Sequence, residues 1–172
     1  MADRKKLEQA APRRLRLAAM GMEAECSLML DDQPTRPEAL FGSPRDFIRG
    51  ELMHRQGTSY HLPTGGAVYF DTGVIEVATP VIEIEPGCAA RTGRSLWEAL
   101  QFIRGELDAW DASNGHRTRL VGFSTHYNVS FELPPGEPEN GRTIEQLARL
   151  PTFILPAPVM LLATIRRSTG VG

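Results

Sequence analysis

Gly21-Met22-Glu23-Ala24-Glu25-Cys26 is the stretch that decides the expected fold, because charged and apolar side chains alternate along it. Successive side chains of a β-strand point to opposite faces of the sheet, so Glu23 and Glu25 share one face. Apolar residues flank the stretch on both sides. One interpretation is a solvated strand edge. The other is a partly buried strand whose two carboxylates repel each other unless a cation lies between them. Because buried charges need partners, we favour the second interpretation, a strand that carries a metal site.

Two further segments alternate in the same way. In Ala67-Val68-Tyr69-Phe70-Asp71, the side chains of Tyr69 and Asp71 point to the same face. In Thr125-His126-Tyr127-Asn128-Val129-Ser130-Phe131 the shared face carries polar groups. These are His126, Asn128 and Ser130. A single sheet can gather all three polar faces on one surface, and such a surface suits Mg²⁺, which prefers carboxylate oxygens.

A fourth acidic position follows a tight turn at Thr72-Gly73, where Glu76 lies inside a strand predicted over residues 74–78. Asp71 has a simpler explanation, since an aspartate often starts a turn through its own side chain. Glu83 and Glu85 alternate with isoleucines and fit a solvated strand face at least as well as a functional one. No zinc-ligand spacing, nucleophile elbow or phosphate-binding glycine loop is present in the sequence.

The remaining pattern predicts an α+β fold. A capping box at Ser95 opens an amphipathic helix, whose apolar stripe is Leu96, Leu100, Ile103, Leu107 and Trp110. We also expect a short helix from Ser43 to about Arg55, loops over residues 31–37 and 56–66, and two strands over residues 117–123 and 125–133. Near the end of the chain we expect a short helix capped by Thr143 and a buried helix over residues 153–167. Strands followed by a helix on one side indicate a mostly antiparallel sheet with helices on its apolar face.

Composition narrows the functional class. The chain has 172 residues and a formal net charge of −2, so no overall basic field favours nucleic acid. Its two cysteines lie far apart and give no disulfide framework, which indicates a reducing compartment. No apolar run is long enough for a membrane span. We therefore expect a cytoplasmic protein that contacts neither membrane nor nucleic acid, with a flexible basic lead-in at residues 1–16 and one domain over residues 17–172.

Four blocks, in order, resemble a known family. They are Met20-Gly21-Met22-Glu23-Ala24-Glu25, Gly65-Gly66-Ala67-Val68-Tyr69-Phe70-Asp71, Glu76-Val77-Ala78-Thr79-Pro80 and Ser124-Thr125-His126-Tyr127-Asn128. The first resembles the opening strand of the glutamine synthetase-like carboxylate–amine ligases. The four together are most similar to the Pup ligase and Pup deamidase/depupylase family, which acts on a small protein modifier.

The resemblance implies a glutamine synthetase-like sheet cradle, with ATP and Mg²⁺ as cofactors. It implies transfer of the γ-phosphoryl group of ATP to a glutamate carboxylate of Pup, after which a lysine amine displaces phosphate and an isopeptide bond forms. The alternative reaction in the family is hydrolysis of such an isopeptide bond. It further implies that Glu23, Glu25 and Glu76 bind metal and that Asp71 is the catalytic aspartate. Tyr69 would line the metal site. His126 and Asn128 would contact nucleotide phosphate or metal.

The sequence differs from the family pattern in two places and in length. Val74-Ile75 stand where the family commonly has His-Pro, and Val81 stands where it commonly has an acid. Family members are more than twice as long, which leads us to expect an N-terminal portion completed by a missing C-terminal half. Two alternatives remain open. One is a glutamate–cysteine ligase-like enzyme acting on a small amino acid, and the other is a non-catalytic remnant that binds nucleotide or a protein.

Overall fold

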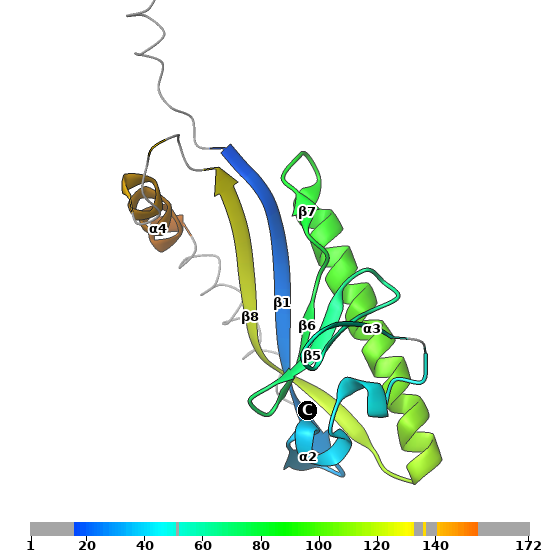
Figure 1. Cartoon of the computed structure of the whole chain (residues 1–172). Helices are drawn as coiled ribbons and strands as arrows, with labels where there is room; N and C mark the ends of the chain where they lie inside the picture. The colour runs from blue at the N-terminus through cyan, green and yellow to red at the C-terminus, as the bar shows by residue number, and fades with distance from the viewer. Residues whose placement is uncertain (1–15, 51, 133–135, 137–140, 155–172) are drawn as a thin grey trace, which may run out of the picture. The chain divides into compact units, whose positions relative to one another are not determined.

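The computed structural model describes residues 16–50, 52–132, 136 and 141–154 (Figure 1). The predicted basic lead-in and the helix predicted over residues 153–167 lie outside these residues, except at their adjoining ends. The chain divides into two compact units. One spans Leu17–Ser130, and the other combines Met1–Arg16 with Phe131–Gly172. The described part of the second unit includes helix α4 (Arg142–Ile154), which agrees with the short helix expected near Thr143.

Eight strands of the described residues form one sheet, whose main path runs β2-β1-β6-β5-β4-β3. The long strand β1 organises it, because β7 and β8 also pair with β1. The strands are β1 (Arg16–Leu30), β2 (Gln33–Thr35), β3 (Met53–Gln56), β4 (Ser59–His61), β5 (Ala67–Asp71), β6 (Val74–Ala78), β7 (Ile82–Glu83) and β8 (Thr118–Glu132).

The pairings along the main path of the sheet and the pairing of β7 with β1 are all antiparallel, as the sequence predicts. Strand β8 also runs opposite to β1, because contacts join Ala19 to Ser130 at one end and Asp31 to Arg117 at the other. Figure 1 shows β8 beside β1, on the side away from β6. The first unit therefore has the mostly antiparallel sheet expected of an α+β fold.

Alternation along the strands separates an apolar face from a polar one. In β1 the side chains of Ala24, Cys26 and Leu28 are buried, and so are Ile75 and Val77 in β6. Helix α3 (Cys88–Asn114) covers this apolar face and contributes Ala99, Ile103 and Leu107 to the same core. Each large side chain buried in this way contributes about 1.5–3 kcal/mol. The predicted helical stripe is thus part of the core, although α3 begins at Cys88 rather than near Ser95.

The segment between β2 and β5 differs most from the prediction. The helix expected from Ser43 to Arg55 is wrong. Ser43 does form a capping box with Asp46, but only the 3₁₀ turn η1 (Pro44–Asp46) follows, and residues 53–56 form β3. The cap predicts a helix start correctly, but no helical apolar stripe continues it. Phe47 and Ile48 are adjacent and both buried. A short strand lies in each expected loop, namely β2 and β4, and helix α2 (Pro37–Phe41) begins at the last residue of the first one.

Strand β8 is continuous, whereas the sequence indicated two strands separated near Gly122. The side chain of Leu120 packs against the core under α3, whereas that of Ser124 contacts Glu25 on the polar face. The alternation of side chains therefore changes around Gly122 without ending the strand.

Among the described helices, none combines the length and the apolar character that crossing a membrane requires.

Candidate metal centre

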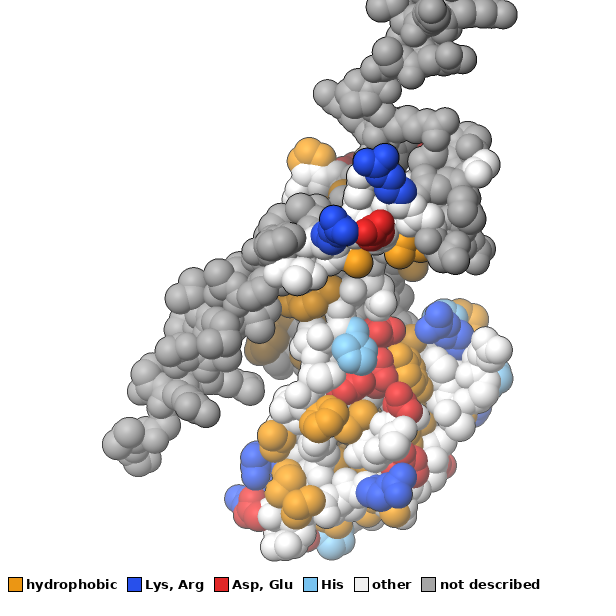
Figure 2. Space-filling model, turned by 90° about the vertical axis from the view of Figure 1, so that its left-hand side faces the viewer, with side chains coloured by type: hydrophobic (Ala, Val, Ile, Leu, Met, Phe, Trp, Pro, Cys, Tyr) orange, Lys and Arg blue, Asp and Glu red, His pale blue; other side chains and the backbone are white. Residues whose placement is uncertain are grey.

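The register of three strands builds the floor of the site. Glu25 in β1 lies opposite Glu76 in β6, and Glu76 lies opposite Tyr69 in β5, so one row crosses all three strands. Glu23 lies two residues from Glu25 and shares its face. This face is opposite to the one that α3 covers, because the intervening Ala24 and Cys26 are buried in the core. Figure 2 shows the resulting patch of acidic side chains beside a histidine.

Two overlapping groups of side chains can each hold a cation. Glu23, Glu76 and His126 form one group, and Glu25, Asp71 and Glu76 form the other. Within each group the ligand atoms all lie within 4.8 Å of one another. Glu76 belongs to both groups, which makes it the central residue of the cluster. Carboxylate oxygens with one imidazole nitrogen suit Mg²⁺ or Mn²⁺, so the chemistry of the donor set fits the metal that the sequence implies.

Strand β8 supplies hydroxyl, amide and imidazole partners for the carboxylates of β1. Ser124 Oγ donates to Glu25 Oε2 at 2.6 Å, and Asn128 Nδ2 donates to Glu23 Oε2 at 3.0 Å. His126 lies between these two contacts. Its Nδ1 is 3.6 Å from Glu23 Oε2 and its Nε2 is 3.7 Å from Glu25 Oε1. These contacts orient the carboxylates of both glutamates over the polar face of the sheet, which β1 shares with β5 and β6.

The electrostatics of Glu76 are those of a buried carboxylate among like charges. Its residue is only 4% exposed. Burial raises the pKa of Glu76 above its ordinary value, a hydrogen bond from Tyr69 lowers it, and the charges of Glu23, Glu25 and Asp71 raise it further. Such a group holds a proton more readily than an ordinary glutamate does. A divalent cation would remove the repulsion that raises this pKa.

Tyr69 responds to the same charges. Burial, and then the hydrogen bonds and negative charges of Glu76 and Glu23, raise the pKa of its hydroxyl above the ordinary value. The hydroxyl therefore stays protonated and acts as a donor, directed at Glu23 Oε1 at 3.4 Å. Tyr69 thus holds the orientation of the carboxylates.

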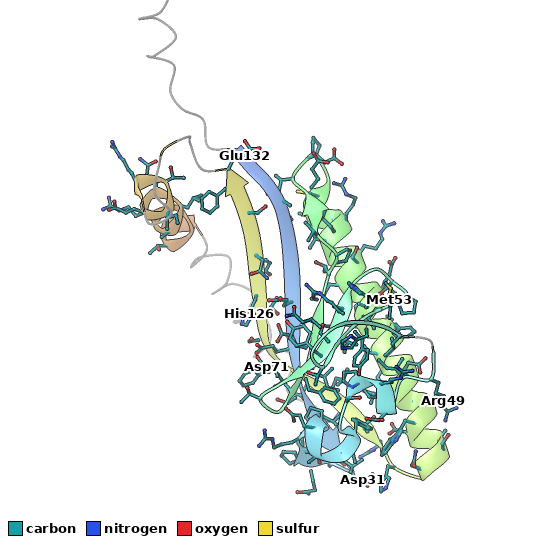
Figure 3. All side chains as sticks on the ribbon, in the orientation of Figure 1. Asp31, Arg49, Met53, Asp71, His126 and Glu132 are labelled. Carbon is teal, nitrogen blue, oxygen red and sulfur yellow. The ribbon has the colours of Figure 1, made fainter. Side chains whose placement is uncertain are left out.

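Asp71 reaches the cluster from the end of β5, immediately before the turn into β6. That turn is the two-residue hairpin expected at Thr72-Gly73. Helix α2 secures it, because Glu38 Oε1 accepts a hydrogen bond from the backbone nitrogen of Gly73 at 2.7 Å. Thr72 Oγ1 also donates to Asp71 Oδ1 at 2.8 Å. Asp71 and His126 are both labelled in Figure 3.

The structure brings together all seven residues that the sequence singled out. Asn128 and Tyr69 contact Glu23 directly, and the other five belong to the two candidate ligand groups. Ser130 lies on the same strand but has a different contact, since its hydroxyl pairs with the backbone of Ala19. Glu83 and Glu85 are exposed and lie outside both groups. The sequence reasoning missed Ser124, although its period-two spacing from His126 and Asn128 was an available signal.

Comparison of the chain with family models, with curated proteins and with solved structures finds no match in any of the three.

Proposed function

We propose that this chain provides the metal- and nucleotide-binding sheet of an ATP- and Mg²⁺-dependent enzyme of the carboxylate–amine ligase class. In this proposal the sheet is a glutamine synthetase-like cradle, and the protein acts in the cytoplasm as a ligase or hydrolase on a Pup-like modifier. One observation carries the proposal. Four carboxylates and an imidazole, contributed by β1, β5, β6 and β8, converge on the face of the sheet that α3 leaves open. The motif resemblance supports the same class.

The roles follow from position and chemistry. Glu23, Glu25 and Glu76 would hold Mg²⁺. The cation would neutralise the charge that develops on a transferred phosphoryl group. His126 and Asn128 lie beside Glu23 and would contact the nucleotide phosphate or the metal. The hydroxyl of Tyr69 stays protonated and fixes Glu23.

Asp71 is the candidate general base of the reaction. Its residue is exposed, so an amine or a water molecule can approach it, and it would take the proton of that nucleophile. The geometry also allows a second role, because an Asp71 oxygen lies among the possible ligands with Glu25 and Glu76. The two roles differ in their effect on metal affinity and can be separated by mutation.

Calorimetric titration with Mn²⁺ and with Mg·ATP tests the proposal. Glu76→Gln should abolish cation binding, because Glu76 belongs to both candidate ligand groups. Glu83→Gln is the matched control, since it removes an exposed strand carboxylate outside the cluster, and it should bind as the parent chain does. If Mn²⁺ binds neither the parent chain nor the control, the metal centre and the proposed activity are both refuted.

The variant Asp71→Asn tests the base role. If Asp71 is the base, turnover should be lost while Mn²⁺ and Mg·ATP affinities stay within about twofold. A loss of Mn²⁺ affinity equal to that of Glu76→Gln would make Asp71 a ligand instead. The acceptor is tested with Pup, free glutamate and free cysteine in parallel, with ADP release as the readout. Release with glutamate and cysteine but not with Pup would favour the small-amino-acid ligase.

A further inference from the structure

The sheet opens next to the acidic cluster, where β1 exchanges one partner strand for another. Glu23 pairs with Ala78 of β6, and Met20 pairs with Ile82 of β7. Between these two pairs, the three residues Thr79–Val81 lie opposite only two residues of β1, Gly21 and Met22. The extra residue makes this a β-bulge. Bulges are over-represented beside active sites, where they redirect the chain.

Hydrogen bonds hold this bulge in place. The backbone nitrogen of Thr79 donates to Met22 O at 2.8 Å, and the Met22 nitrogen donates to Thr79 Oγ1 at 3.0 Å. The threonine side chain thus replaces a backbone acceptor at the point where the strands separate. Pro80 follows and has no N–H to continue the ladder.

A trough of about 350 Å³ lies over the bulge. It is lined by Ala19–Glu23, Arg55, Ala78–Thr79, Val81 and Asn128–Ser130. Ala19, Gly21 and Glu23 alternate along β1, so the floor of the trough continues the face that carries the metal cluster. Its volume is at the small end of the range for ligand sites.

Gly21 keeps the trough open. A Cβ added at Gly21 would lie 3.5 Å from Thr79 Oγ1, an ordinary van der Waals distance, and no other atom approaches it within 4 Å. The backbone therefore does not require glycine at this position. The absent side chain has a different effect, since it leaves space beside Glu23.

Arg55 is the sole cationic residue among the described residues that line the trough. It extends from β3, the strand that Met53 marks in Figure 3. Within the described part of the chain, no ion pair or hydrogen bond engages its guanidinium group. By contrast, the exposed side chains of Arg117 and Arg119 are both paired with Asp32. An unpaired guanidinium at the lip of a trough can bind an oxyanion with two parallel hydrogen bonds.

We propose that the trough is a subsite for a second oxyanion of the ligand, with Arg55 as its counter-charge, while the cation at Glu23 and Glu76 holds the first. This inference rests on the proposed metal centre. The ligand class is a small molecule with two separated oxyanions, either a polyphosphate or a dicarboxylate. The acidic cluster repels such a ligand in the absence of metal, so its binding requires the cation at one end and Arg55 at the other.

The test uses the full chain with two probes, inorganic triphosphate and glutarate, each titrated in the presence of saturating Mg²⁺. Arg55→Met should weaken binding of the probe by about 10–100-fold, the scale of one hydrogen-bonding contact to a charged group. Arg45→Met is the matched control. It removes an exposed arginine from η1, away from the trough, and should leave the affinity unchanged. Gly21→Val should block the probe by filling the trough.

The two arms and a separate Mn²⁺ titration distinguish the outcomes. Loss confined to triphosphate identifies a polyphosphate ligand, and loss confined to glutarate identifies a dicarboxylate. Three outcomes would overturn the subsite while leaving the metal centre intact. The first is equal probe affinity of Arg55→Met and the parent chain, and the second is an equal loss in Arg55→Met and Arg45→Met. The third is that neither probe binds to a chain that binds Mn²⁺. A chain that binds no Mn²⁺ refutes the metal centre and the subsite together.

Discussion

At the scale of single residues, Glu76 is the position where the requirements of stability and of function differ most. It is buried on the sheet between Glu25 and Tyr69, and it belongs to both candidate ligand groups. A carboxylate in that position destabilises the metal-free fold, because it is desolvated and repelled by its neighbours. A structural role alone offers no reason for such a residue, whereas a cation site does.

Glu76→Gln should therefore stabilise the metal-free protein by about 1 kcal/mol near neutral pH, the scale of a stabilising substitution at a functional site. The pKa of Glu76 is raised in the fold above its ordinary value of 4.5. The proton that Glu76 binds more tightly in the fold therefore contributes fully to stability below that ordinary value. This contribution is lost as the pH rises through the raised pKa. The difference in unfolding free energy between Glu76→Gln and the parent chain should grow from acid to neutral pH. Urea denaturation at a series of pH values, with a chelator present, measures it. A difference that is constant with pH would contradict this account.

The shared faces of the candidate site were predictable, because strand alternation assigns Glu23 and Glu25 to one face and His126 and Asn128 to another. The roles of Glu76 and Asp71 came from the family resemblance. The sequence does not reveal the register in which neighbouring strands pair. Placing Glu25 opposite Glu76 requires knowing which residues pair between β1 and β6. Arg55 was not predictable for a related reason, since it lies in a segment read as the end of a helix, and its position depends on β3 joining the far end of the sheet.

At the scale of elements, the β5–β6 hairpin positions Asp71 by means of a strained turn. Thr72 has φ 49° and Gly73 has φ 98°. A positive φ at a β-branched residue is unfavourable, whereas Asn tolerates it and Asn-Gly is the preferred pair for such turns. The hydrogen bonds of Glu38 and Thr72 compensate for the strain in this turn.

Thr72→Asn should raise the unfolding free energy by about 0.5–1 kcal/mol, because it removes part of the cost of a left-handed backbone. Thermal unfolding followed by circular dichroism measures the change. The control is Thr58→Asn, in the turn between β3 and β4, since Thr58 is not among the residues with positive φ. An equal gain in both variants would show that the turn conformation is not the cause.

Close backbone approach at Gly66 sets the start of the same hairpin. A Cβ at this position would lie 2.2 Å from the carbonyl oxygen of Ala78, a distance that requires the backbone to move. Gly66→Ala should therefore destabilise the protein by about 1–3 kcal/mol, as overpacking does. Gly93→Ala in α3 meets no atom within 4 Å and should instead stabilise by about 0.5–1 kcal/mol, through better helix propensity. Chemical denaturation of both variants would reveal opposite signs, and a shared sign would refute the steric argument.

The elements with strong periodicity were predicted well, and the short ones were not. The stripe in α3 and the alternation in β1, β5 and β6 each extend over enough residues to specify their type. Strands β2 and β4 have three residues each, and their pairing with longer neighbours decides their conformation. The turn η1 shows the converse, because a correct local cap does not extend a helix when the next apolar residues, Phe47 and Ile48, must both enter the core.

At the scale of the whole molecule, core and candidate metal centre lie in the same compact unit, on opposite faces of one sheet. Every residue of the buried cluster, from Leu28 to Leu107, falls within Leu17–Ser130. The seven candidate site residues fall within it as well. The unit thus contains the interactions that stabilise the sheet and the groups that would bind the cation.

A chain limited to residues 17–130 should therefore fold cooperatively and bind Mn²⁺ with an affinity within about threefold of the full chain. The physical reason is that core packing dominates stability, and this fragment retains the whole described core. Urea unfolding gives the cooperativity, and calorimetry gives the affinity. Because a cation that binds only the folded state stabilises it by about 2.7 kcal/mol at one hundred times its dissociation constant, Mn²⁺ should also raise the midpoint of unfolding in fragment and full chain alike. A fragment that folds but no longer binds Mn²⁺ would show that the other unit contributes ligands, and one that fails to fold would place part of the stabilising core outside residues 17–130.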